Sequence, residues 1–167
     1  MRVLAIDPAL RKTGYAVLER LGRDTTCLTH GVIINPTARR QSQCLVAIRE
    51  ELHRVIRDHK PDVCAVEGII FVQSFKTAII MGAARGAALL AAAEHDLAIF
   101  EYAPRRVKQA VVGRGGAQKQ QVAFMIRALL SLRETLAPDA ADALAIGLTH
   151  LQADDPRSNL SKLKEQI

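Results

Sequence analysis

Two spacings of apolar residues divide this chain into predicted strands and helices. Short apolar runs recur through the first part of the chain, and unbroken runs of this kind are typical of strands buried on both faces of a sheet. The first three runs are joined by short polar turns, which predicts an antiparallel meander. The predicted strands cover residues 3–6, 15–18, 25–34, 62–67 and 97–102.

Helical spacing takes over between and after the last two strands. From residue 38 to residue 59 the apolar side chains recur every three or four positions, as they do in an amphipathic helix. Pro104 and Pro138 suit the first turn of a helix, where the missing N–H is no loss. The predicted helices cover residues 38–59, 75–95, 105–112 and 118–132, and a last one begins at Pro138.

The order of these elements predicts the fold class. Three strands are followed by helix, strand, helix, strand and further helices, an order typical of α/β proteins with a ribonuclease H-like fold. We therefore expect a mixed five-stranded sheet flanked by helices. A chain of 167 residues usually forms one domain, which we expect at residues 1–153. The polar stretch at 154–167 is expected to be a C-terminal tail.

Charge and cysteine content narrow the class of partner. The formal net charge is +6, which favours a polyanion such as nucleic acid. Trp is absent and aromatic residues make up 4%, which argues against a stacking platform for single strands. The three cysteines form no zinc pattern, which fits a reduced, cytoplasmic setting. The longest apolar tract, 78–93, contains Arg85 and is short for a bilayer span, so we expect no membrane.

Four carboxylates fall at the ends of predicted elements. Asp7 and Glu67 each end a buried strand, where open α/β sheets place their ligands. Asp139 and Asp142 are three residues apart and share one face of the last helix. Taken singly, each has a plain explanation, as a turn residue beside Pro8 or a carboxylate at a helix N-terminus. Together, in a basic protein, they predict a site for hard divalent cations, which prefer oxygen ligands and can support phosphodiester hydrolysis.

A series of short segments resembles the RuvC family of Holliday junction resolvases, bacterial endonucleases with a ribonuclease H-like fold. Any one segment is weak, but the set is specific because it runs in unbroken order over about residues 2–150. The segments are 6–8, 13–15, 65–67, 82–86, 100–109, 111–113, 118–119, 121–122 and 139–145.

The resemblance implies a set of site residues. It implies that the catalytic, metal-binding carboxylates are Asp7, Glu67, Asp139 and Asp142. It implies two Mg2+ ions, with Mn2+ as the alternative, and two basic residues near the scissile phosphate, Lys108 and Lys119. Arg105 and Arg114 add positive charge around the Gly-rich segment at 113–116, so we expect DNA contacts from Arg105, Lys108, Arg114 and Lys119.

One segment departs from the family pattern. Family members carry a loop aromatic after the catalytic glutamate, and that aromatic meets the bases of the junction. Here Ile70 stands at the usual place and Phe71 follows it, while Gln73 and Ser74 replace the usual Lys and Asn. We expect Phe71 and Gln73 to contact DNA.

The predicted function is an Mg2+-dependent, structure-selective endonuclease of four-way (Holliday) DNA junctions. Paired symmetric nicks would leave 5′-phosphate and 3′-hydroxyl ends, in homologous recombination and DNA repair, and a branch-migration motor complex is an expected partner. One alternative is a ribonuclease H-like nuclease for another structure, such as an RNA–DNA hybrid. Another is a non-catalytic DNA-binding protein, although carboxylates beside phosphates oppose binding without a metal. An actin-like ATP-binding module is excluded by the short chain and the lack of a second phosphate loop.

The predicted helix at 75–95 suggests an oligomer. It is apolar nearly all round, which is more than a helix on one face of a sheet needs. Gly82 and Gly86 are four residues apart and form a flat strip where another backbone can approach. A two-fold dimer buries the same patch on both subunits, and the RuvC resemblance points the same way. We therefore expect a homodimer with Gly82 and Gly86 in its interface.

Overall fold

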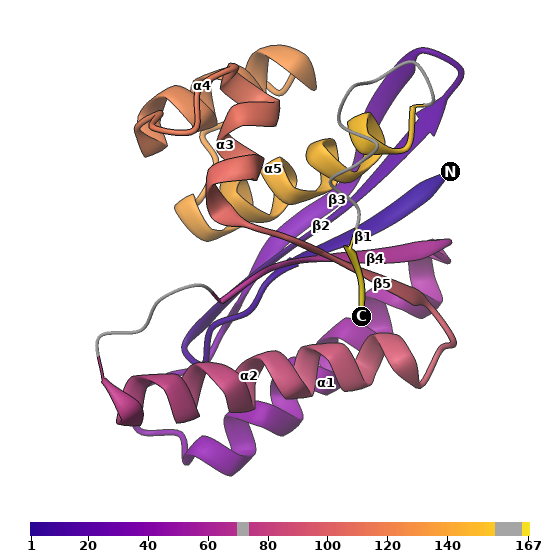
Figure 1. Ribbon diagram of the computed structural model, residues 1–167. Coiled ribbons are helices and arrows are strands. Elements are labelled where there is room, and N and C mark those ends of the chain that lie inside the picture. Colours follow the sequence, from indigo (N-terminus) through magenta and orange to yellow (C-terminus); the bar gives the residue numbers. More distant parts are fainter. Residues whose placement is uncertain (70–73, 156–164) are drawn as a thin grey trace.

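The computed structural model describes residues 1–69, 74–155 and 165–167, which form a mixed sheet with helices on both faces (Figure 1). Across this six-stranded sheet the strands are β3 (Asp24–Ile34), β2 (Lys12–Leu21), β1 (Arg2–Asp7), β4 (Val63–Glu67), β5 (Ala98–Tyr102) and β6 (Glu165–Gln166). Strand β4 runs parallel to both β1 and β5, and the other neighbouring pairs are antiparallel.

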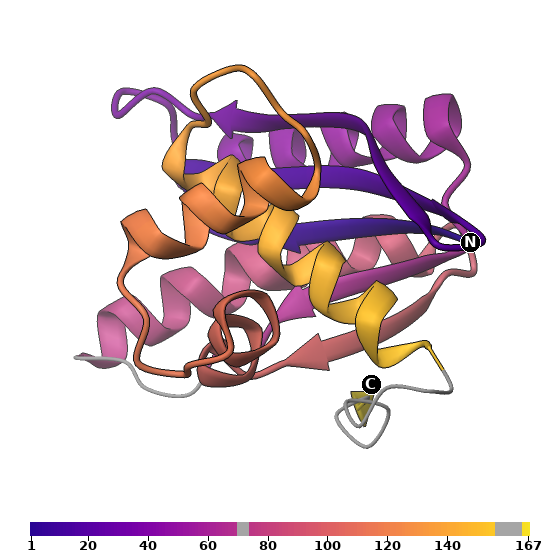
Figure 2. The ribbon, with the colours of Figure 1, turned by 90° about the horizontal axis from the view of Figure 1, so that it is seen from above.

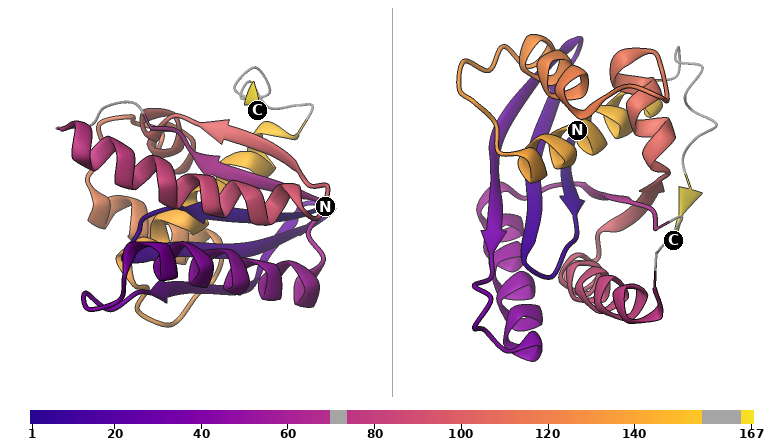
Figure 3. Two further views of the ribbon diagram at one scale, coloured as in Figure 1. Left: turned by 90° about the horizontal axis from the view of Figure 1, so that it is seen from below. Right: turned by 90° about the vertical axis from the view of Figure 1, so that its left-hand side faces the viewer.

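The helices of the described residues are divided between the two faces of the sheet. α1 (Gln41–His59) and α2 (Phe75–Ala93) lie next to each other on one face, as Figure 3 shows from below. α3 (Pro104–Val112), α4 (Lys119–Leu129) and α5 (Pro138–Ala153) cover the opposite face (Figure 2). The sheet is therefore the middle of three layers.

The central strand β1 shows why an unbroken apolar run is needed here. Its residues from Val3 to Ile6 are fully buried. Val3 and Ala5 enter the core under α3, α4 and α5, whereas Leu4 and Ile6 enter the core over α1 and α2. Because alternate side chains of the strand fill two different cores, no polar position interrupts the run.

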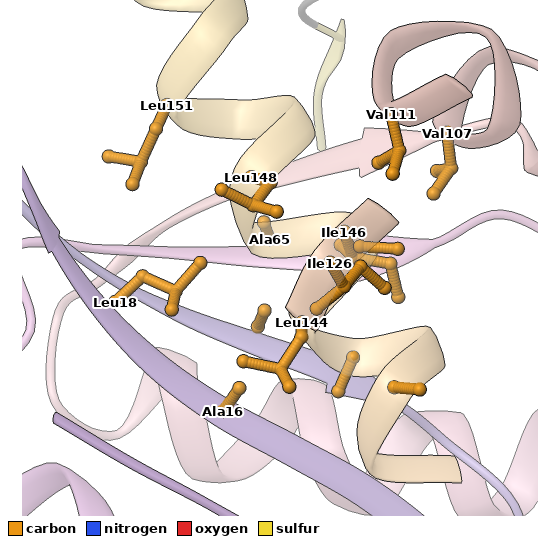
Figure 4. Packing of buried hydrophobic residues seen from close by; sticks show 14 of the residues in the cluster. Ala16, Leu18, Ala65, Val107, Val111, Ile126, Leu144, Ile146, Leu148 and Leu151 are labelled. Carbon is orange, nitrogen blue, oxygen red and sulfur yellow. The ribbon is translucent and has the colours of Figure 1, made fainter. Parts of the chain in front are cut away.

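α5 lies across the sheet and is buried along nearly its whole length. Figure 4 shows Leu144 of this helix in one core with Leu18 of β2. Gly147 permits the close approach, because a Cβ there would lie 2.8 Å from Leu18 Cδ1. This packing sets the position of the start of α5, which carries Asp139 in its first turn and Asp142 one turn later.

The structure confirms the predicted order of elements and extends the sheet. β2 is longer than the predicted 15–18 because it pairs with β3 from Lys12 to Leu21. β6 adds two residues beside the edge strand β5, so the described sheet has six strands where five were predicted. β6 is exposed and polar, and only its backbone pairing makes it a strand, so no apolar pattern marks it.

α2 is apolar around more of its circumference than its packing uses. One side is buried through Ala84 and Ala88, whereas Phe75 and Ile79 are 92% and 69% exposed. Within the described residues, α2 alone is long and apolar enough to cross a membrane by length and composition, a test that core helices of soluble proteins also pass. Length is therefore no argument against a span, and the expectation of no membrane stays a prediction.

Candidate active site

Asp7 and Glu67 lie next to each other at one edge of the sheet. Parallel pairing sets Ile6 beside Val66, and in each strand the next residue is the carboxylate. Neighbouring strands are about 4.8 Å apart. The structure thus brings together the two carboxylates that end the two buried strands.

Gly14 brings the start of α5 to the same place. It pairs with Asp7 across the β1–β2 ladder. A Cβ on Gly14 would lie 1.9 Å from the backbone oxygen of Asp139, so only glycine leaves room for the helix here. Asp142 follows one turn later on the same helix face. Two strands and one helix therefore direct all four predicted carboxylates to one region.

The pKa values of the two strand carboxyls report this crowding. Burial, followed by the charge of Asp142, raises the pKa of Asp7 from 3.8 to about 6. Burial, followed by the charges of Asp7 and Asp142, raises the pKa of Glu67 from 4.5 to about 7. Asp139 also raises the pKa of Asp7. The negative charge of the cluster is thus only partly compensated by its surroundings.

Two lysines partly balance the negative charge of the carboxylates. Lys119, the first residue of α4, donates from Nζ to Oδ2 of Asp142 at 2.8 Å. This hydrogen bond raises the pKa of the Lys119 ammonium. Lys108 of α3 lowers the pKa of Glu67, as Lys119 does. The structure therefore places both predicted basic residues close enough to act on the carboxylates.

A cavity of about 370 Å³ opens beside Asp7 and Glu67. Arg105, one of the predicted DNA contacts, lines it. Arg85 also lines it, and sequence reasoning gave this residue no role. Arg85 donates to the backbone oxygen of Glu67 at 2.7 Å and pairs with Glu101. The available signal was a single charged residue in the apolar tract at 78–93.

Of the remaining predicted residues, those that the structure describes form no hydrogen bond or ion pair with the carboxylates. Arg114 is exposed in the turn between α3 and α4, and in the described part of the chain it forms no ion pair with the cluster. Gly82 and Gly86 are exposed on α2 with open space where a Cβ would be. Phe71 and Gln73 lie outside the described residues.

The donor set fits a hard divalent cation by its chemistry. All four candidate ligands are carboxylates, and oxygen ligands are what Mg2+ prefers. Burial raises the pKa values of Asp7 and Glu67 most, and neighbouring carboxylates raise them further, a repulsion that a bound cation would relieve. As the side chains stand, no group of three or more His, Cys, Asp or Glu in the described ranges is arranged to hold a metal. Lys119 occupies one oxygen of Asp142.

Comparisons with known proteins agree on one family. Residues 3–150 match the family model of the crossover junction endodeoxyribonuclease RuvC. The chain is 59% identical over 156 residues to the crossover junction endodeoxyribonuclease RuvC of Akkermansia muciniphila, covering 93% of each chain. It is 42% identical over 163 residues to that of Bordetella petrii, covering 98% of this chain and 90% of the relative.

A solved structure gives the same result. RuvC from T. thermophilus, determined in complex with a Holliday junction substrate, superimposes with a TM-score of 0.90 at 31% identity. The match covers 100% of this chain and 99% of that chain. This likeness confirms the ribonuclease H-like α/β fold expected from the sequence. With the family match over residues 3–150, it shows that the chain belongs to the RuvC family of crossover junction endodeoxyribonucleases.

Proposed function

We propose that this protein cuts four-way DNA junctions by metal-dependent hydrolysis. The cuts would be paired, symmetric nicks that leave 5′-phosphate and 3′-hydroxyl ends, and the work would belong to homologous recombination and DNA repair. The observation that carries the proposal is the meeting of carboxylates from β1, β4 and α5 beside two lysines. The names of the relatives, and the Holliday junction in the T. thermophilus complex, support the choice of substrate.

The four carboxylates would hold the metal: Asp7, Glu67, Asp139 and Asp142. When bound, two Mg2+ ions, or Mn2+ instead, would supply an activated water and stabilise the leaving oxygen. Without a cation, a carboxyl with a pKa near 7 holds its proton for part of the time at neutral pH. Cation binding and proton loss at Glu67 are therefore coupled, because the charged form is the ligand.

The lysines would act on the phosphate rather than on the metal. The side chain of Lys119 is 72% exposed, and its ammonium is bonded to Asp142. It can therefore also reach a phosphate that lies beside Asp142. Lys108 acts on Glu67 from the neighbouring helix. Positive charge beside a reacting phosphate stabilises the transition state more than the bound substrate. Arg105, Arg114, Phe71 and Gln73 would add contacts to the DNA.

The exposed face of α2 supports a homodimer. Phe75, Ile79 and Leu90 are 92%, 69% and 49% exposed on it. Gly82 and Gly86 lie between them and leave room for an approaching backbone. A two-fold pair of these faces would present two active sites to the two equivalent strands of a junction. A cytoplasmic setting and a branch-migration motor complex are the remaining proposed context.

One experiment separates this function from its alternatives. A synthetic four-way junction, a duplex of matched sequence and an RNA–DNA hybrid are each incubated with the protein in Mg2+ and in EDTA. We expect paired cuts in the junction alone, and only with Mg2+. Cleavage of the hybrid in preference to the junction would favour the other nuclease, and binding without cleavage in any metal would favour a non-catalytic DNA-binding protein.

A further inference from the structure

Arg85 joins three elements of the fold at the edge of the active site. It lies on α2, and its side chain is only 13% exposed. Nη1 donates to the backbone oxygen of Glu67, the last residue of β4, at 2.7 Å. Nη2 pairs with Oε2 of Glu101 in β5. One guanidinium therefore ties a helix to the ends of two neighbouring strands.

The peptide that follows Glu67 is held from several sides. Its carbonyl accepts from Arg85, and the next N–H, of Gly68, donates to the backbone oxygen of Tyr102 at 2.9 Å. The side chain of Glu101 packs on Gly68: a Cβ on Gly68 would lie 2.6 Å from Oε1 of Glu101. The backbone at the end of β4 is thus fixed where the strand would otherwise open into a loop.

We infer that Arg85 is a positioning residue for cleavage: it holds the backbone of Glu67, with Glu101, so that the Glu67 carboxylate stays in register with Asp7. The inference rests on the proposed function of these carboxylates. Arg85 acts through the main chain and makes no recorded contact with the carboxylate itself.

Arg85 suits a geometric task, because the planar fork of a guanidinium can serve a carbonyl and a carboxylate at once. Its two acceptors here are the backbone oxygen of Glu67 and the carboxylate of Glu101. Loss of Arg85 should therefore slow cleavage while the binding of the junction is kept.

The position of Arg85 on α2 links the site to the proposed dimer face. Gly86 follows it directly and Gly82 lies three residues before, both on the exposed side. Arg85 points toward β4 and β5. A partner subunit that shifts α2 along its axis would therefore move the anchor of Glu67.

The test compares Arg85→Met with a matched control. Arg49→Met removes a second arginine that pairs with a glutamate, Glu94, at 2.7 Å. Glu94 caps the far end of α2, nine positions along the chain from Arg85, which is roughly 14 Å along a helix. For each variant we measure Tm, junction Kd and the single-turnover rate at which a four-way junction is cut at saturating protein.

We expect Arg85→Met to cut about 100-fold more slowly, the size of loss that a misplacement of about 1 Å can cause. Junction Kd should stay within about threefold of the wild-type value, because both acceptors of Arg85 are protein groups. Arg49→Met should cut at the wild-type rate. Glu101→Gln should be milder, and the double variant no slower than Arg85→Met alone, because the two residues act as one unit.

Several results would overturn the inference. Cleavage by Arg85→Met within about threefold of wild type would do so, as would an equal loss in Arg49→Met. If Arg85→Met does not fold, Arg85→Lys takes its place, because its ammonium keeps the charge but lacks the planar fork that spans the two acceptors. The same outcomes then apply. Wild-type protein that cuts no junction would refute the proposed function instead, so the two failures are distinguishable.

Discussion

Replacing Asp7 with asparagine should stabilise the fold at alkaline pH. Burial and the charge of Asp142 raise the pKa of Asp7 from 3.8 to about 6. The folded protein therefore holds this proton more tightly than the unfolded chain does. As the pH rises from 3.8 to about 6, the free energy of unfolding of the wild type falls. Above a pH of about 6 the loss is complete. Asparagine carries no proton to lose and has nearly the same volume.

The interval between 3.8 and about 6 sets the size of the effect. It corresponds to about 3 kcal/mol, at about 1.4 kcal/mol for each tenfold change. At pH 4 most of this cost is still absent. The stability advantage of Asp7→Asn over the wild type should therefore grow by about 2.5 kcal/mol between pH 4 and pH 8. Of the neighbouring charges, that of Asp7 raises the pKa of Glu67 most. Its removal should therefore also lower the pKa of Glu67.

Urea unfolding in EDTA at pH 4 and pH 8 measures this difference without interference from a bound cation. Asp24→Asn is the control, because Asp24 is exposed at the start of β3 and its removal should change stability by less than about 0.5 kcal/mol at either pH. An advantage of Asp7→Asn that does not grow with pH would refute the reasoning. It would mean that Asp7 is not held in a crowded, buried cluster.

Three further outcomes follow from the geometry. Lys119→Ala removes the ammonium at 2.8 Å from Asp142, and should slow cleavage about 100-fold at saturating protein while junction Kd changes little. Equal losses in rate and in affinity would make Lys119 an ordinary phosphate contact. Gly86→Leu adds bulk to the open face of α2, and light scattering should show a monomer at concentrations where the wild type is a dimer. Gly14→Ala forces a Cβ toward the Asp139 oxygen, 1.9 Å away, and should lower Tm by about 5–10 °C and reduce cleavage.

Much of the fold could be predicted because burial on two faces leaves a strong mark on a strand. In β1 and β4 each apolar side chain enters one of two cores, so the strands at 3–6 and 62–67 could be recognised from their apolar residues. β6 could not, because two exposed polar residues pair with β5 through their backbone only. The full length of β2 was equally hidden, since its ends are set by pairing with β3.

The site was partly predictable for a similar reason. Strand ends in a parallel pair must meet at one edge, so Asp7 and Glu67 could be joined from sequence. That Asp139 reaches them depends on Gly14, whose missing Cβ admits the start of α5. The contact of Arg85 with the backbone of Glu67 depends on how α2 is turned about its axis. Neither relation has a local signal, because each is set by packing between distant segments.

Cleavage by Asp7→Asn tests the central claim most directly, namely that the carboxylates at this sheet edge are the catalytic ligands. Binding and single-turnover cleavage of a four-way junction in Mg2+ are measured for this variant, for wild type and for the Asp24→Asn control. We expect Asp7→Asn to bind the junction as tightly as the wild type or more tightly, because a charge that repels phosphate is gone, and to give no product. Asp24→Asn should cut normally. Cleavage by Asp7→Asn at close to the wild-type rate would contradict the account.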